Sequence, residues 1–174
     1  LCSPQSNAEA FWATAGGMGL TGVISDIELR LQRISSSYIK TRYLPAESLD
    51  VLMDSFAQHE ADHQFSVAWI DCFAAGKGLG RGVLMLGDFA QAHELPQTLA
   101  GQPLAWPSQK TISIPVDLPE FVLNRLSVML FNELFYRAHA SSTRLIHADK
   151  FFFPLDSISN FNRLYGKRGF VQYQ

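Results

Sequence analysis

The sequence has little of several features that mark common classes of protein. It contains two cysteines in 174 residues, Cys2 and Cys72, with no cysteine or histidine beside either at metal-ligand spacing, which favours reduced thiols over a disulfide framework or a zinc finger. A formal net charge of −2 offers no basic excess for nucleic acid. No apolar run reaches the roughly 18 residues of a membrane span, and the first residues lack the regions of a signal peptide. With 47% hydrophobic residues, the composition is globular, and the reduced state expected for the two thiols leads us to expect a cytoplasmic protein.

The two ends of the sequence suggest a piece of a longer protein. The sequence begins without a methionine, at Leu1. At the other end, Gly169–Gln174 alternates in the manner of a strand, and the sequence stops there without a turn or a polar tail. We therefore expect a fragment of a larger enzyme.

The first 34 residues contain G-x-G-x-x-G at Gly17–Gly22, the fingerprint of dinucleotide-binding Rossmann folds. In those folds the glycine turn leaves a strand and opens a helix. Here an apolar stripe of helical spacing comes first, from an N-cap at Asn7 to Gly16, and alternating residues follow at Val23–Leu31. The order predicts a helix, a glycine turn and a strand, and argues against a Rossmann site.

The residues that follow predict a strand, a helix and two more strands. The first strand is expected at Tyr38–Leu44, and Pro45 is expected in the first turn of the helix, whose apolar face is Leu49, Leu52, Met53 and Phe56. Alternation at Phe65–Trp69 and the run Val83–Leu86 predict the other strands. This order is typical of an antiparallel α+β domain.

The second half of the chain is less regular. Five prolines in Pro96–Pro119 predict an irregular crossing segment. A long helix is expected to open at Pro119-Glu120 and to bury one stripe, and a strand is expected at Arg144–Phe153. The stripe comprises Phe121, Val122, Leu126, Met129, Leu130 and Leu134. Beyond it we expect Asp156 to cap a short helix carrying Phe161 and Asn162, and Tyr165-Gly166 to turn into a final strand.

Two polar clusters could be interpreted as a phosphate loop and a zinc site, but the residues around them argue against both interpretations. The glycine-rich Gly76–Gly82 lacks a serine or threonine after Lys77, so a hairpin loop is favoured over a phosphate loop, with Lys77 and Arg81 keeping its tip in water. His59 and His63 have the i, i+4 spacing of zinc ligands on a helix, but no third ligand can be named. We therefore predict no metal site and name no catalytic side chain.

Two long motifs carry a family resemblance. The run from Asn7 to Ile24, NAEAFWATAGGMGLTGVI, resembles the closing segment of the flavin domain in FAD-linked oxidases of the vanillyl-alcohol-oxidase fold. Near the other end Phe152-Phe-Pro-Leu-Asp, Asn162-Arg-Leu-Tyr-Gly and Gly169-Phe-Val-Gln-Tyr-Gln follow in the family's order. The shorter Ala68-Trp-Ile-Asp and Leu79-Gly-Arg-Gly lie between them. The resemblance spans almost the whole chain.

The resemblance implies a fold and a division of the chain. Residues 1–34 would be the end of the FAD-binding domain, a helix-turn-strand remnant, and residues 35–174 part of the substrate-binding cap. The expected fold class is thus α+β, an antiparallel sheet with helices packed on one face. The family's phosphate-binding loop would precede Leu1, so we expect FAD to bind the full-length protein and not this fragment, which alone would be inactive. Unpaired strands at the two ends would favour self-association of the fragment.

The resemblance also implies a function, the oxidation of a CH–OH group of a sugar or sugar-like alcohol with hydride transfer to FAD. The residues expected to bind the cofactor are Gly17, Gly19, Gly22, Val23 and Ile24. Those expected to bind the substrate, a small sugar-like molecule, are Trp12, Phe152, Phe161, Gln172 and Gln174. In the sugar-oxidising branch of the family, the position that matches Phe152 holds a tyrosine and the position that matches Phe161 holds a tryptophan. This chain therefore lacks two side-chain hydrogen-bond donors at those positions. The exact sugar is therefore open.

Composition alone leaves a second function open. Aromatic side chains as dense as Phe151, Phe152, Phe153, Phe161, Tyr165, Phe170 and Tyr173 are usually core. If part of this cluster were exposed, the chain would be a non-enzymatic α+β binding or assembly domain that recognises a partner through an aromatic face. The colour of the full-length protein would separate the two hypotheses.

Overall fold

The structure is a computed structural model that describes residues 1–106, 111–119 and 121–168. The chain divides into two compact units, Leu1–Arg33 and Ile34–Gln174.

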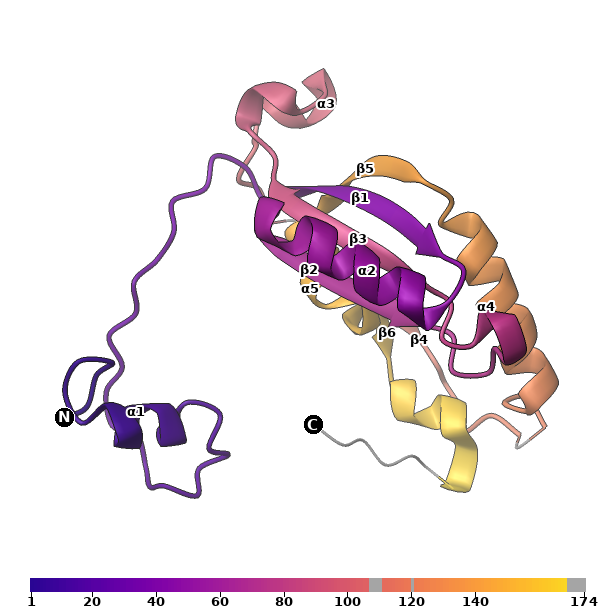
Figure 1. The fold of residues 1–174 in the computed structure, drawn as a ribbon, viewed down its shortest axis with the longest axis horizontal. Coiled ribbons are helices and arrows are strands. Elements are labelled where there is room, and N and C mark those ends of the chain that lie inside the picture. Colours follow the sequence, from indigo (N-terminus) through magenta and orange to yellow (C-terminus); the bar gives the residue numbers. More distant parts are fainter. Residues whose placement is uncertain (107–110, 120, 169–174) are drawn as a thin grey trace. The chain divides into compact units, whose positions relative to one another are not determined.

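The first unit contains one helix, α1 (Ala8–Thr14), and no buried residue (Figure 1). Asn7 occupies the N-cap position, but its side chain donates to the Leu1 carbonyl instead of capping the helix. The expected strand at Val23–Leu31 is wrong, because the structure shows this segment without a strand. A strand exists through hydrogen bonds to a neighbour, and the described part of this unit offers no second strand to pair with.

The second unit is built on a four-stranded antiparallel sheet in the order β2-β3-β1-β5 (Figure 1). The strands are β1 (Tyr38–Ala46), β2 (Phe65–Ile70), β3 (Gly82–Phe89) and β5 (Ser142–His147). The predicted order of strand, helix, strand and strand is confirmed, as is the glycine-rich connection between antiparallel β2 and β3, which holds the short helix η2 (Gly76–Gly78).

Helix α2 (Leu49–His59) covers one face of the sheet. Its Leu52 packs in a cluster of buried side chains with Ala46, Leu84 and Leu86. The helix begins later than predicted, after the N-cap Ser48, whose side chain accepts the Val51 N–H. Pro45 lies in β1 opposite Val83 instead. Because β5 pairs with β1 only up to Tyr43, the missing N–H of Pro45 leaves no hydrogen bond of that ladder unmade.

The other face of the sheet carries α4 (Arg125–Ala138) and α5 (Ala148–Phe152). Tyr43 and Leu44 point to opposite faces because side chains alternate along a strand. The ring of Tyr43 contacts His139, which follows α4, while Leu44 joins the α2 cluster. The α+β class with an antiparallel sheet and helices packed against it is confirmed, and the helices flank both faces where one was expected.

Helix α4 differs from its prediction in start and orientation. It begins at Arg125, where the Asn124 side chain accepts two backbone N–H groups and Ser127 completes a capping box. Five side chains of the stripe expected in the core are 41–79% exposed: Phe121, Leu126, Met129, Leu130 and Leu134. The face that packs carries Asn132, which is buried, and Phe135, whose ring lies 4.6 Å from that of Trp69. The helical spacing predicted the helix correctly, but the helix packs against the sheet through a different face from the one expected.

The remaining elements are short. The segment 96–119 is largely irregular where described, as predicted, with α3 (Gln97–Ala100) and with β4 (Ile112–Ser113), which pairs in parallel with β6 (Ile158–Ser159). The expected strand Arg144–Phe153 is half right, because β5 ends at His147 and α5 follows. Asp156 lies within the short helix η4 (Pro154–Ser157) and does not cap η5 (Phe161–Arg168), the helix that carries Phe161. Two further turns are η1 (Glu60–Asp62) and η3 (Ala92–Glu94).

Candidate functional site

The residues expected to border a flavin all lie in the first unit. Gly19 and Gly22 have positive φ, 77° and 140°, and no atom lies within 4 Å of the point where a Cβ would stand at either. The backbone at both positions can therefore be approached closely. Gly17 ends the first turn after α1, and a Cβ there would collide with the Ala13 carbonyl oxygen. Val23 and Ile24 are exposed.

The residues expected to contact substrate are spread over both units. Trp12 on α1 is 63% exposed and packs edge-to-face on Phe11. Phe152 on α5 is 42% exposed, and its ring meets Phe65 at 4.9 Å. Phe161 in η5 pairs with Tyr165 at 5.7 Å. Gln172 and Gln174 lie outside the described residues.

Phe152 belongs to an aromatic cluster at one end of the sheet. Its members are Phe65 of β2, Phe89 of β3, and Phe151 and Phe152 of α5, with ring centroids 4.9–6.2 Å apart. Gly87 makes this packing possible, because a Cβ there would stand 2.8 Å from the Phe151 ring and from Ile39 Cγ2. The cluster holds α5 on the sheet and leaves part of Phe152 in solvent.

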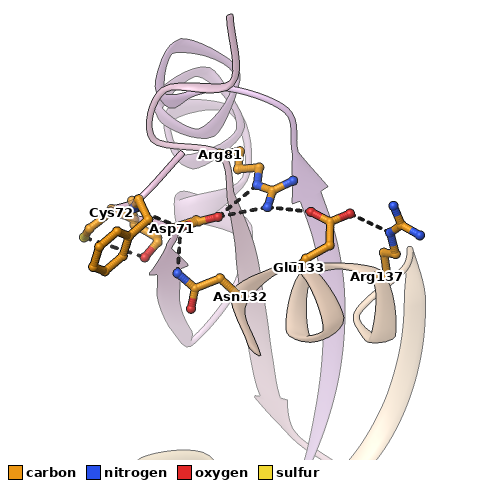
Figure 2. A network of polar contacts seen from close by, with 8 residues as sticks. Asp71, Cys72, Arg81, Asn132, Glu133 and Arg137 are labelled. Atoms are coloured by element: carbon orange, nitrogen blue, oxygen red, sulfur yellow. Dashed lines mark hydrogen bonds and ion pairs between the residues drawn. The ribbon is translucent and has the colours of Figure 1, made fainter. Parts of the chain in front are cut away.

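A polar network that no sequence pattern indicates joins α4 to the β2–β3 connection (Figure 2). Asp71, which follows β2, is 2% exposed and accepts from the Arg81 guanidinium at 2.9 Å and from the Asn132 amide at 2.6 Å. Arg81 also meets the Glu133 carboxylate at 2.7 Å, and Glu133 meets Arg137 at 2.6 Å. Arg81 was expected to keep a loop tip in water; instead it lies between two carboxylates. Asp71 and Arg81 lie in two of the family motifs, Ala68–Asp71 and Leu79–Gly82, but nothing in those motifs indicates their partners on α4.

Electrostatics favour the ionised form of the network. Burial by itself raises the pKa of Asp71, but hydrogen bonds from the Phe73 N–H, Arg81 and Asn132 outweigh it and hold that pKa below its ordinary value. Hydrogen bonds from Arg81 and then Arg137 lower the pKa of Glu133. Desolvation lowers the pKa of Arg81, yet its two carboxylate partners raise it overall. With each charge paired, the network serves to dock α4 and offers no free acid or base.

The two histidines weighed as zinc ligands lie on separate elements. His59 ends α2, where its Nδ1 faces the Ser55 carbonyl oxygen at 2.9 Å. His63 follows η1, and its Nδ1 lies 2.6 Å from Asp88 Oδ2. Across the described ranges, no three histidine, cysteine or carboxylate side chains gather as metal ligands would. Nor does any helix in the described part have the length and apolar character to cross a bilayer.

A known protein matches nearly the whole chain. The chain is 31% identical over 173 residues, 97% of its length, to decaprenylphosphoryl-beta-D-ribose oxidase of Mycolicibacterium smegmatis. The chain is similar to part of this oxidase. The resemblance read from the motifs is thereby confirmed, although the chain spans only 37% of the oxidase's length.

A second relative matches a shorter stretch. It is 34% identical over 135 residues, 74% of this chain and 37% of its own length, and is named an uncharacterized protein in the mprA 5′ region of Streptomyces coelicolor. No family model matches the chain. Of these two relatives, the oxidase has the name that bears on function.

Proposed function

We propose that the chain is part of a FAD-dependent oxidoreductase that oxidises a CH–OH group of a sugar or sugar-like alcohol. The supporting observation is the identity to the ribose oxidase, which runs through both units of the chain. In this proposal residues 1–34 border the flavin, and residues 35–174 form part of a cap on the substrate side. When bound, FAD would supply the hydride acceptor, and the chain's own residues would bind and orient the two reactants.

The glycine turn after α1 fits a role beside a flavin. Gly19 and Gly22 hold conformations that side chains rarely adopt, and the space beside them is open. Their backbone N–H groups can therefore approach a ring or a phosphate without a Cβ in the way. Gly17, Val23 and Ile24 would complete this edge of the cofactor site.

The aromatic residues fit the wall of a substrate pocket. Phe152 is held by Phe65 and Phe151 and still exposes part of its ring. A ring fixed in this way can exclude water from a reacting alcohol at little further cost in side-chain entropy. In this proposal Trp12 and Phe161 would each also contact the substrate, and Gln172 and Gln174 would hydrogen-bond the substrate or the flavin.

The alternative function, a non-enzymatic binding or assembly domain, is supported by one observation. Helix α4 exposes a stripe of large apolar side chains, as surfaces that recognise partner chains do. This alternative predicts a protein without a flavin.

The flavin content of the full-length protein tests the proposal. We expect the purified full-length protein to be yellow, and denaturation to release about one flavin per chain. The matched control is the 174-residue chain, which should be colourless when purified in the same way. A colourless full-length protein that is folded would contradict the enzyme proposal and favour the binding domain.

The two glutamines near the end of the chain test the substrate side. In the full-length protein, Gln174→Ala and Gln172→Ala should each lower kcat about threefold to tenfold, the loss expected for one hydrogen bond of roughly 0.5–1.5 kcal/mol. Alternation in the expected strand places both amides on one face and Val171 on the other. Val171→Ala should therefore lower the melting temperature and leave kcat near wild type. Unchanged turnover in both glutamine variants, measured with sugar alcohols as substrates, would remove them from the site.

A further inference from the structure

His147 lies where three segments of the second unit meet. It ends β5, and Ala148, the first residue of α5, donates its N–H to the Ser37 carbonyl at 2.8 Å. The imidazole contacts the ring of Tyr38 on β1 at 5.3 Å and that of Trp106 at 4.6 Å. Residues 103–106 are thus held beside the strand that leads into α5.

The two ring nitrogens of His147 have partners of opposite kinds. Nδ1 lies 3.3 Å from the backbone N of Asp149, and Nε2 lies 3.3 Å from the Ala105 carbonyl oxygen. A backbone N–H can only donate and a carbonyl can only accept. Nδ1 must therefore be without a proton, and Nε2 must carry one. Both bonds exist together only in the neutral Nε2–H tautomer.

Two other histidines show the opposite pattern. Nδ1 of His59 faces the Ser55 carbonyl at 2.9 Å, and Nδ1 of His139 faces the Phe135 carbonyl at 2.8 Å. In each, Nδ1 has to carry the proton, and protonation of the second nitrogen leaves that bond intact. Among these three rings, only the Nδ1 bond of His147 is incompatible with a doubly protonated imidazole.

We propose that His147 is a positioning residue whose neutral form caps α5 and thereby places Phe152, and that proton uptake at Nδ1 removes this cap while the bond to Ala105 persists. The significance of Phe152 rests on the proposed function, in which it lines the substrate pocket. The Asp149 N–H belongs to the first turn of α5, where a backbone N–H has no carbonyl within the helix to donate to, and His147 Nδ1 is its acceptor.

Proton uptake acts through two physical effects. It places the new Nδ1–H against the Asp149 N–H, so an accepting group becomes a second donor. It also adds positive charge at a helix N-terminus, where the helix dipole is already positive. Asp149 and Lys150 are the charged residues of α5 nearest this end, whereas Tyr38 and Trp106 contact the ring from the other two segments. The aromatic packing of Phe151 over Gly87 does not depend on the proton.

The tautomers provide the first test. Long-range proton–nitrogen NMR correlations on the ¹⁵N-histidine-labelled chain at about pH 8, where free histidine is neutral, should show His147 protonated on Nε2. His59 and His139 should show Nδ1–H in the same spectrum, each assigned by the loss of its signals in a His→Asn variant. An Nδ1–H tautomer at His147 would overturn the proposal.

The position of Phe152 provides the second test. In the chain labelled with fluorophenylalanine, the Phe152 ¹⁹F signal, assigned by its loss in Phe152→Leu, should differ between a basic solution, where the imidazole is neutral, and an acidic one, where it carries a second proton. His147→Asn retains a side-chain oxygen that can cap, so its Phe152 signal should match wild type at pH 8 and no longer shift with pH. His147→Ala should show the acidic position at every pH.

The variants also separate this proposal from the proposed function. An asparagine variant that shifts with pH as wild type does, or an alanine variant that matches wild type at pH 8, would overturn the role of His147. None of these readouts involves a flavin, so a colourless full-length protein would remove the proposed function and leave the NMR result unaffected.

Discussion

Replacing Asp71 with alanine should destabilise the chain by about 3 kcal/mol, the low end of the loss expected when one partner of a buried ion pair is removed. Asp71 is almost fully buried and accepts from Arg81, Asn132 and the Phe73 N–H. The substitution leaves the Asn132 amide without its acceptor inside the fold, whereas Arg81 keeps Glu133. Urea unfolding followed by circular dichroism would measure the change.

The exposed end of the same network provides the matched control. Arg137 is on the surface and contacts only Glu133 of this network, so Arg137→Ala should change stability by a small fraction of the Asp71→Ala loss. Equal losses in the two variants would show that burial does not distinguish the two ends of the network, and would contradict a larger contribution of the buried Asp71 to the docking of α4.

The stability that Asp71 contributes should also depend on pH. Its folded-state pKa lies below the ordinary 3.8, so the unfolded chain binds its proton first as the pH falls. The contribution is therefore complete at pH values above 3.8 and is lost as the pH falls through the folded-state pKa. The difference in unfolding free energy between wild type and Asp71→Asn should narrow over that acidic range. A constant difference would mean that the carboxylate is not the titrating group.

Truncating Leu52 to alanine should cost about 2–5 kcal/mol, the range for large-to-small changes in well-packed cores. Leu52 is 1% exposed and is the residue of α2 buried in the cluster with Ala46, Leu84 and Leu86. Removing it leaves a cavity between the helix and the sheet. Urea unfolding would again measure the loss, with an unchanged m-value as the sign that the unfolded state is unaffected.

Met53 is the matched control for this prediction. It stands next to Leu52 on the same helix but is 60% exposed, so Met53→Ala should alter stability by no more than about 0.5 kcal/mol. If both variants lost similar amounts, the helix would not pack through the face that the structure shows. Helical spacing alone predicts both residues on one apolar face.

Local patterns in the sequence were sufficient for the centre of the fold. The alternation at Phe65–Trp69 located β2, the apolar run Val83–Leu86 located β3, and helical spacing located α2. The strand expected at Tyr38–Leu44 is β1. Patterns of this kind work here because a strand or helix in a small domain must bury one side, and the period of the burial appears directly in the residue order. The family resemblance likewise followed from residue order alone, through motifs at both ends of the chain.

Tertiary structure decided what these patterns could not. Val23–Leu31 alternates as a strand should, but forms none where no partner strand is described, since strand hydrogen bonds come from a neighbour. The spacing in α4 predicted a helix but the wrong buried face, because Asn132 and Phe135 contact Asp71 and Trp69, which come from β2 and the residue that follows it. The network of Asp71, Arg81 and Glu133 joins residues up to 62 positions apart in the sequence numbering. Hydrogen bonds between such distant residues depend on how the chain folds back on itself, which no local pattern records.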